Sequence, residues 1–137
     1  MLGEKTVAVL DENLSSGIAF NTLAHLALSI GKNAVDVMGK EELTDASGTT
    51  HKGLSKYPFI ILKAESEKIR QIVNEAKGNA GLLVVDFPEQ GYTEYTDEEL
   101  QAAIAKTKEE NIKYYGTAIF GPTKEIDELT KELALWK

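Results

Sequence analysis

Three charged side chains stand where apolar runs typical of β-strands come to an end. Asp11 follows TVAVL, Lys63 closes FIILK, and Asp86 follows LLVV. Ligands in open α/β sheets collect outside the carboxyl ends of parallel strands, so parallel strands would bring these groups to one crevice. A lysine between two carboxylates is most often a structural ion-pair cluster. In the functional interpretation, Lys63 donates a hydrogen bond or transfers a proton to a ligand.

A polar stripe on an otherwise apolar predicted helix, residues 17–30, supplies the next candidate. Its members are three or four residues apart, which puts them on one helix face. They are Asn21, Thr22, His25 and Ser29. Two interpretations of the histidine stay open: a buried imidazole hydrogen-bonded by Asn21 or a backbone carbonyl, and a general acid or base. The candidate catalytic residues are therefore His25, Lys63 and Asp86.

The residues at the start of the same helix have two interpretations: they could bind an anion, or they could simply cap the helix. Ser15, Ser16 and Gly17 could present backbone N–H groups to an anion, or a serine could cap the helix. Tyrosines at four later positions would line a pocket wall or pack between sheet and helix. They are Tyr92, Tyr95, Tyr114 and Tyr115. The candidate ligand-binding residues are Asp11, Ser16, Gly17, Asn21 and Thr93.

The sequence gives no reason to expect a metal or a cofactor. Its two histidines are far apart, and His51 lies in a Gly/Thr-rich stretch where we expect an exposed bystander. The chain has no cysteine, which excludes a disulfide framework, a thiolate metal site and a cysteine nucleophile. It also lacks the glycine patterns of nucleotide-binding loops. We therefore predict no metal and no cofactor.

Strand and helix patterns alternate along the chain. Strong strands are expected at residues 6–10, 59–63, 82–85 and 114–120, with a short one at 33–38. Helices are expected at residues 17–30, 65–77 and 96–110, the last opened by a Thr96–Glu99 capping box, and from residue 123 onward. Residues 39–55 and 89–96 are interpreted as loops. The pattern predicts an α/β fold: a three-layer α/β/α sandwich, a mixed sheet of about four strands, and a single domain over residues 1–137.

Charge and hydropathy narrow the classes of partner. The 137 residues carry a net charge of −7, concentrated in the last third, which opposes binding to a phosphate backbone. No segment is apolar enough to cross a bilayer, and without a signal pattern a cytoplasmic location is expected. No charged residue lies between Glu12 and Lys32, so we expect the helix of residues 17–30 to be covered on most of its circumference.

Three stretches of the chain resemble the type 2 peptidyl-tRNA hydrolases. They are VAVLDENLSSGIAFNTLAH at residues 7–25, PFIILKAESEKIRQIVNEAK at residues 58–77, and GTAIFGPTKEIDELTKELAL at residues 116–135. The chain is still more similar to a relative group in that superfamily, the domain-of-unknown-function family number two thousand. That group shares the Asn-x-x-Ala-His helix and an end like Leu135–Trp136. The resemblance implies the peptidyl-tRNA hydrolase type 2-like fold.

The departures from the hydrolase pattern oppose that activity. Where those enzymes carry a lysine and a glutamine taken as catalytic or substrate-orienting, this chain has Ile18 and Thr22. Tyr92 stands where their basic residue would be, and an acidic helix is inserted before the last strand. The resemblance therefore implies the fold without the hydrolase's catalytic set.

Three functions stay open. The favoured one is binding of a small anionic or peptide-like ligand in the crevice of Asp11, Asn21, His25, Lys63 and Asp86, with hydrolysis as an extension and enzyme status left open. An active peptidyl-tRNA hydrolase is the disfavoured alternative. The third is a non-enzymatic module whose uncharged helix or tyrosine-bearing loop contacts a second copy to form a homodimer.

Overall fold

The computed structural model describes residues 3–137 as a mixed α/β fold. The strands are β1 (Glu4–Asp11), β2 (Glu42–Thr44), β3 (Thr50–Lys52), β4 (Phe59–Ala64), β5 (Leu83–Pro88), β6 (Tyr114–Pro122) and β7 (Ala134–Leu135). The helices are α1 (Ser16–Asn33), α2 (Ser66–Lys77), α3 (Gln90–Thr93), α4 (Asp97–Ala105) and α5 (Thr123–Thr130), with a 3₁₀ turn η1 (Glu109–Asn111). The predicted α/β class is confirmed.

The central sheet has five strands in the order β5-β6-β1-β4-β7. β1 and β4 pair in parallel, whereas β6 runs antiparallel to both β1 and β5, so β1, β4 and β5 all run in one direction. The prediction of about four strands was one short, because the two-residue β7 adds an antiparallel edge to β4. Two residues are too few to leave an alternating pattern in the sequence.

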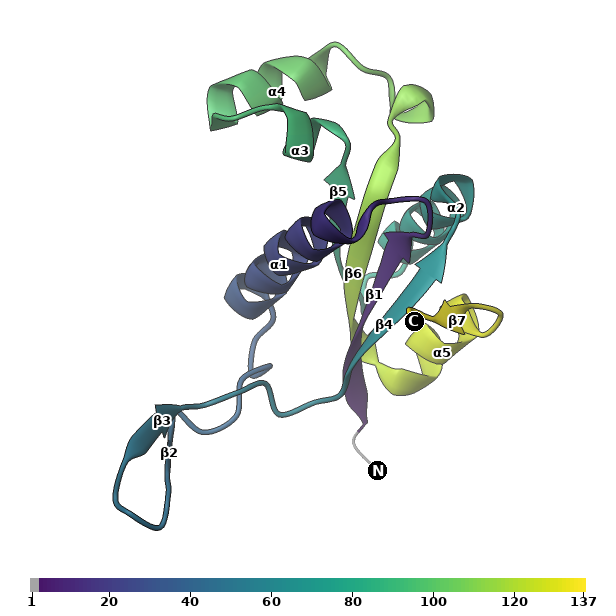
Figure 1. Cartoon of the computed structure of the whole chain (residues 1–137). Coiled ribbons are helices and arrows are strands. Elements are labelled where there is room, and N and C mark those ends of the chain that lie inside the picture. The colour runs from purple at the N-terminus through teal and green to yellow at the C-terminus, as the bar shows by residue number, and fades with distance from the viewer. Residues whose placement is uncertain (1–2) are drawn as a thin grey trace.

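One side of the sheet is closed by α2 and α5 (Figure 1). The apolar residues of α2 recur at three- and four-residue spacing, and all of them are buried: Ile69, Ile72, Val73 and Ala76. They pack against Val7 and Val9 of β1 and Ile119 of β6, while α5 adds Ile126. This layer holds one of two apolar clusters of similar size, one on each side of the sheet.

The other side of the sheet carries α1 alone (Figure 1). Its buried stripe is Ala19, Thr22, Leu26 and Ile30, which rests on Leu10, Ala118 and Phe120 of the sheet. The expectation that this uncharged helix is covered on most of its circumference was wrong: Phe20 is 62% exposed and Leu28 is 73% exposed. The missing charges therefore mark an open apolar surface. Within residues 3–137, no helix has both the length and the hydropathy needed to span a membrane.

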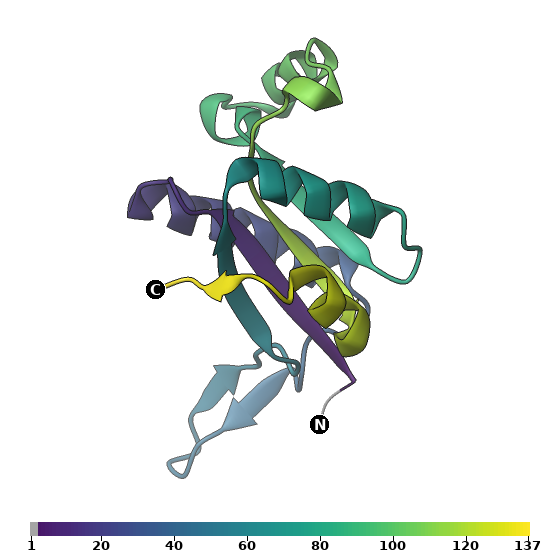
Figure 2. The same cartoon turned by 90° about the vertical axis from the view of Figure 1, so that its right-hand side faces the viewer.

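Two excursions leave the sheet at opposite ends (Figure 2). The first, residues 89–113 between β5 and β6, contains α3, α4 and η1 and is called the lobe. The predicted Thr96 cap is present, since the Thr96 side chain accepts a hydrogen bond from the Glu99 N–H at 3.1 Å. The predicted helix of residues 96–110 ends early, at Ala105, and the predicted loop of residues 89–96 contains α3.

The second excursion, residues 37–56, is called the arm. The predicted strand at residues 33–38 is absent, because α1 continues to Asn33 and only Met38 forms a bridge, with Ser55. The predicted loop at residues 39–55 is instead the β2–β3 hairpin. Its tip is held by Asp45, which accepts from the Ser47 and Thr49 N–H groups. His51 is exposed as expected, but it pairs with the Asp45 carboxylate at 2.9 Å, which lowers the pKa of Asp45.

Candidate functional site

His25 lines a cleft between α1, the end of β5 and the lobe. The cleft has a volume of about 320 Å³. Its floor is apolar, formed by Leu26, Val85 and Phe87, and the His25 ring lies 5.6 Å from the Phe87 ring, centroid to centroid. Within residues 3–137 the His25 imidazole has no hydrogen-bond partner and is exposed to solvent, so its nitrogens are available to a ligand. The interpretation as a buried, satisfied histidine was wrong.

The lobe supplies the polar wall of the cleft. Glu94 and Asp97 both line it, as does Tyr95, which is 94% exposed. The lining residues include no lysine and no arginine. With two carboxylates, an imidazole and an aromatic ring, the cleft offers hydrogen-bond acceptors and a π-face, which suit a ligand bearing an amine.

A chain of aromatic rings supports the cleft floor from below. Phe87 stacks on Tyr115 at 6.4 Å, and Tyr115 meets Tyr92 at 6.2 Å, centroid to centroid. The Tyr115 hydroxyl donates to the Glu89 carboxylate at 3.4 Å. Burial, followed by the negative charge of Glu89 and this hydrogen bond, raises the pKa of Tyr115. A Cβ on Gly91 would meet the Phe87 ring at 3.1 Å, so glycine lets the lobe backbone approach the floor closely.

The Asp86 side chain lies on the α2 side of the sheet, opposite the side that carries α1 and the cleft. Strand residues alternate between faces, and Asp86 points toward α2, where its carboxylate pairs with Lys77 at 2.9 Å. Asp86 still borders the cleft as part of the β5 segment that forms its edge. The Asp86 carboxylate, which the sequence predicted to be catalytic, is therefore already paired with Lys77.

Lys63 does not reach the cleft. It lines a separate, open cavity at the β4 edge together with Glu12 and Glu65. In the sheet order, β6 and β1 stand between β5 and β4, which separates the strands of Asp86 and Lys63 by about 14 Å. The strands are parallel as supposed, but the expected convergence of Asp11, Lys63 and Asp86 on one crevice was wrong, because β6 inserts between β5 and β1.

The predicted ligand-binding residues are dispersed. Asp11 is 1% exposed, and its carboxylate accepts from the Asn13 N–H at 3.0 Å in a turn after β1. Ser16, Gly17 and Asn21 are exposed on α1 but belong to no cleft lining, and the Ser15 cap makes no side-chain hydrogen bond. Thr93, at the end of α3, donates to Glu94 at 3.0 Å, so it orients one cleft carboxylate from outside the lining.

Sequence reasoning missed Glu94 and Asp97 as lining residues. Their charges were assigned to a loop and to the solvated start of a helix, which is their most common role. The usable signal was the dense cluster of aromatic and acidic residues at residues 92–97, directly after an apolar strand.

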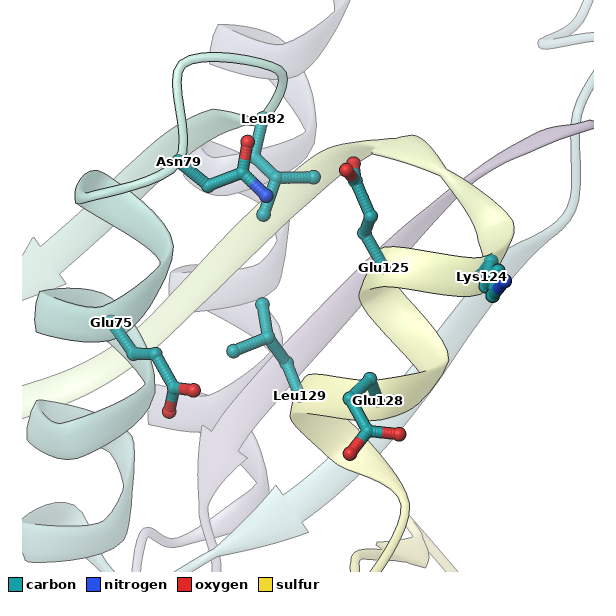
Figure 3. A pocket seen from close by; sticks show the side chains of 7 residues that line it. All are labelled: Glu75, Asn79, Leu82, Lys124, Glu125, Glu128 and Leu129. Carbon is teal, nitrogen blue, oxygen red and sulfur yellow. The ribbon is translucent and has the colours of Figure 1, made fainter.

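A second, larger hollow lies on the α2–α5 side (Figure 3). Its volume is about 580 Å³, and its polar groups are Glu75, Glu125, Glu128, Lys124 and Asn79. Glu75 stands on α2, Lys124, Glu125 and Glu128 stand on α5, and Asn79 lies on the loop after α2, all around Leu82 and Leu129. Among the described residues no three His, Asp or Glu side chains are arranged to hold a metal ion. We place the candidate site at the smaller of these two cavities, because it combines an imidazole with aromatic rings, whereas the larger hollow has neither among its lining residues.

The fold and the cleft define the class: a small mixed α/β protein whose five-stranded sheet carries a helical lobe beyond one end. Residues 4–137 match the family described as "Protein of unknown function (DUF2000)", and the chain belongs to this family. The predicted resemblance is therefore confirmed at the family level.

A solved structure extends the comparison to the whole fold. It is that of a protein of unknown function, Atu0240, from Agrobacterium tumefaciens strain C58. The two chains are 20% identical, the match covers 100% of each, and the TM-score is 0.87. At this identity the likeness shows the fold alone. No curated protein matches the sequence.

Proposed function

We propose that the chain binds a small, peptide-like molecule bearing a free amine in the cleft between α1 and the lobe. The observation that carries the proposal is the lining itself: an exposed imidazole and two carboxylates around an apolar, aromatic floor. A pocket of this kind holds the apolar part of a ligand by burial and fixes its orientation through a few polar groups.

Each polar group has a distinct part in this proposal. Glu94 and Asp97 attract the amine, and His25 exchanges a hydrogen bond with a peptide carbonyl or N–H. The anionic alternative is less well supported, because Lys63 lies outside this lining and the lobe is acidic. The proposal is binding; a hydrolytic step would need a proton-transfer partner for His25, and Glu94 and Asp97 are the candidates.

The relation to the type 2 peptidyl-tRNA hydrolases also stands as a proposal, supported by the resemblance of three stretches of sequence. Peptidyl-tRNA hydrolysis by this chain is disfavoured. Thr22 is fully buried on the sheet-facing side of α1 and Ile18 is partly buried, so neither offers the polar group that the hydrolase pattern has there. We expect no cleavage above background when purified protein is incubated with peptidyl-tRNA at low salt.

Calorimetric titration with two matched dipeptides tests the binding proposal. Leucyl-lysine amide carries only positive charge, whereas leucyl-glutamate adds acidic groups at the same length. We expect the first to bind and the second to bind at least about tenfold more weakly, because the cleft carboxylates repel it.

Variants then locate the binding. Glu94→Gln and His25→Ala should each weaken binding of leucyl-lysine amide about tenfold. Glu128→Gln, in the hollow of Figure 3, removes one negative charge elsewhere and serves as the control. Equal losses in all three variants would mean that the effect is one of net charge, and the cleft would not be the site.

A further inference from the structure

The outer face of α1 is an apolar surface without a partner in the described chain. Phe20, Ala24 and Leu28 follow at intervals of four residues, so they form one row along the helix. The row lies opposite the stripe that packs on the sheet, and all three residues are exposed. An uncharged, exposed row on the longest helix is the kind of surface that marks a protein interface.

Gly31 leaves room on this face for the close approach of another backbone. A glycine inside a helix costs about 1 kcal/mol relative to alanine. A Cβ at Gly31 would meet nothing within 4 Å, so the packing of a single chain gives no reason for the glycine. Gly31 lies seven residues, or two turns, after Ala24, on the same outer face. Small residues there let a second helix pack closely against α1.

The arm continues the apolar surface away from the body. Val35 is 82% exposed, and Met38 and Leu54 on the arm are 49% and 73% exposed. Within the arm, β2 pairs with β3, and the flanking residues also bond to each other, as Gly39 N–H does to Leu54 C=O at 2.8 Å. The arm projects beyond the sheet, as Figures 1 and 2 show. An isolated two-stranded hairpin is marginally stable in water, so a partner surface would stabilise this one.

Exposed apolar groups are concentrated in this segment. Among the described residues nine large hydrophobic side chains are exposed, and six of them lie between Phe20 and Leu54. They are Phe20, Leu28, Val35, Met38, Leu43 and Leu54. With Ala24 and Gly31 they define what we call the α1–arm face.

The net charge of the segment that contains the α1–arm face indicates which partner can dock there. Residues 16–57 contain four acidic and four basic side chains, so the chain's net charge of −7 comes entirely from the rest of the molecule. Two copies of this chain repel each other at any acidic surface, whereas the α1–arm face carries no net charge. A basic partner would be drawn to the acidic surfaces instead. The neutral face is therefore the part of the molecule where a second copy docks without electrostatic cost.

We propose that the α1–arm face joins two copies of this chain in a two-fold homodimer. A two-fold axis pairs one surface with itself, so α1 packs on the partner's α1, and each arm extends along the other copy. Each limb of the arm, residues 37–44 and 49–56, spans up to about 25 Å when extended, close to the length of α1, so the arm can reach over the partner's surface. The proposal is independent of the cleft, because no residue of this face lines it.

Sedimentation velocity on the full chain tests the dimer. The wild-type protein should sediment at twice the chain mass of 15.0 kDa and dissociate only on dilution. Leu28→Glu on α1 and Leu54→Glu on the arm should each weaken dimerisation about thirtyfold or more, as truncation of an interface hot spot does. Leu135→Glu, at a 52% exposed position on β7 outside the face, is the matched control and should stay dimeric.

The Gly31→Ala variant distinguishes an effect on the dimer contact from an effect on the stability of the monomer. Alanine favours the helix, so the far-UV circular dichroism and the urea midpoint of the monomer should hold or rise, while the dimer dissociates more readily. A wild-type chain that is monomeric throughout the concentration series overturns the proposal. So does a dimer that survives Leu28→Glu and Leu54→Glu with circular dichroism unchanged.

Discussion

The two sides of the central sheet differ in what they do with their apolar residues. On the α2–α5 side, Ile69, Val73 and Ile126 are fully buried, and charged groups are tied in ion pairs such as Lys77–Asp86. On the α1 side, Phe20 and Leu28 face outward, and an exposed imidazole borders a cleft. Both sides bury apolar residues against the sheet, but the α1 side also presents exposed apolar residues and the cleft. We therefore expect substitutions of buried residues to change stability, and substitutions in the cleft or on the outer face of α1 to change the proposed contacts.

The largest expected effect comes from removing core volume on the α2 side. Ile72 is 2% exposed, and Ile72→Ala should lower the free energy of unfolding by about 2–5 kcal/mol, through lost burial and the cavity left behind. Tyr95→Ala, at a 94% exposed position on the lobe, should change it by less than about 0.5 kcal/mol. Urea denaturation monitored by circular dichroism measures both, and similar losses would contradict the contrast between the buried core and the exposed lobe.

The next effect concerns the connection between the core and the lobe. Arg70 of α2 donates to the Glu109 carboxylate at 2.6 Å and to the backbone carbonyls of Glu109 and Ile112. Arg70→Ala should cost about 1.5–3 kcal/mol, because these acceptors lose a charged donor. Hydrogen exchange should increase mainly in the lobe. Glu67→Ala removes only an exposed partner of Arg70 at 3.5 Å, and a comparable loss there would contradict this account.

High pH probes the same connection through Tyr114. Burial, then the hydrogen bond to Glu109 and the charges of Asp86 and Glu109, raise the pKa of Tyr114 above its ordinary value of 10.0. The folded state therefore holds this proton more tightly than the unfolded chain. The stabilisation is complete below pH 10 and decreases as pH rises further, by up to about 1.4 kcal/mol per pH unit. Tyr114→Phe should flatten the decrease seen in urea titrations above pH 10, and a decrease that keeps its full slope in this variant would contradict the assignment.

The smallest effect compares two fully buried threonines, one on each side. The Thr117 hydroxyl donates to the Val85 carbonyl at 2.8 Å, whereas the Thr22 hydroxyl on α1 has no partner among the described residues. Thr117→Val should cost about 1 kcal/mol, and Thr22→Val should be neutral or stabilising by a similar amount. The midpoints of thermal unfolding of the two variants, compared with that of the wild-type protein, measure these changes in stability. A clear loss in Thr22→Val would mean that its hydroxyl is satisfied in solution.

Much of the fold could be predicted because its signals are local. The apolar runs at β1, β4, β5 and β6, the spacing in α2, and the Thr96 cap are all properties of short stretches. β7 and the arm strands escaped prediction because two- or three-residue strands carry no readable alternation. The end of α1 was placed early because Gly31 resembles a terminator, although the helix continues through it to Asn33.

The candidate site was predictable only in part, because it depends on strand order. The residues at strand ends were identified, but sequence alone does not state that β6 separates β5 from β1. His25 reached a cleft, yet its neighbours there are Glu94 and Asp97 of the lobe rather than Lys63. Non-local pairing decides which side chains meet, and a single sequence carries little information about that pairing.

Hydrogen exchange measured by mass spectrometry, with and without leucyl-lysine amide, tests the division between the two sides most directly. We predict protection in the middle of α1 around His25, at the end of β5 and across α3 and the start of α4. The segments around Glu75–Leu82 and Lys124–Leu129 should exchange unchanged. Protection confined to those two segments, which line the hollow of Figure 3, or no protection anywhere, would contradict the assignment of recognition to the α1 side.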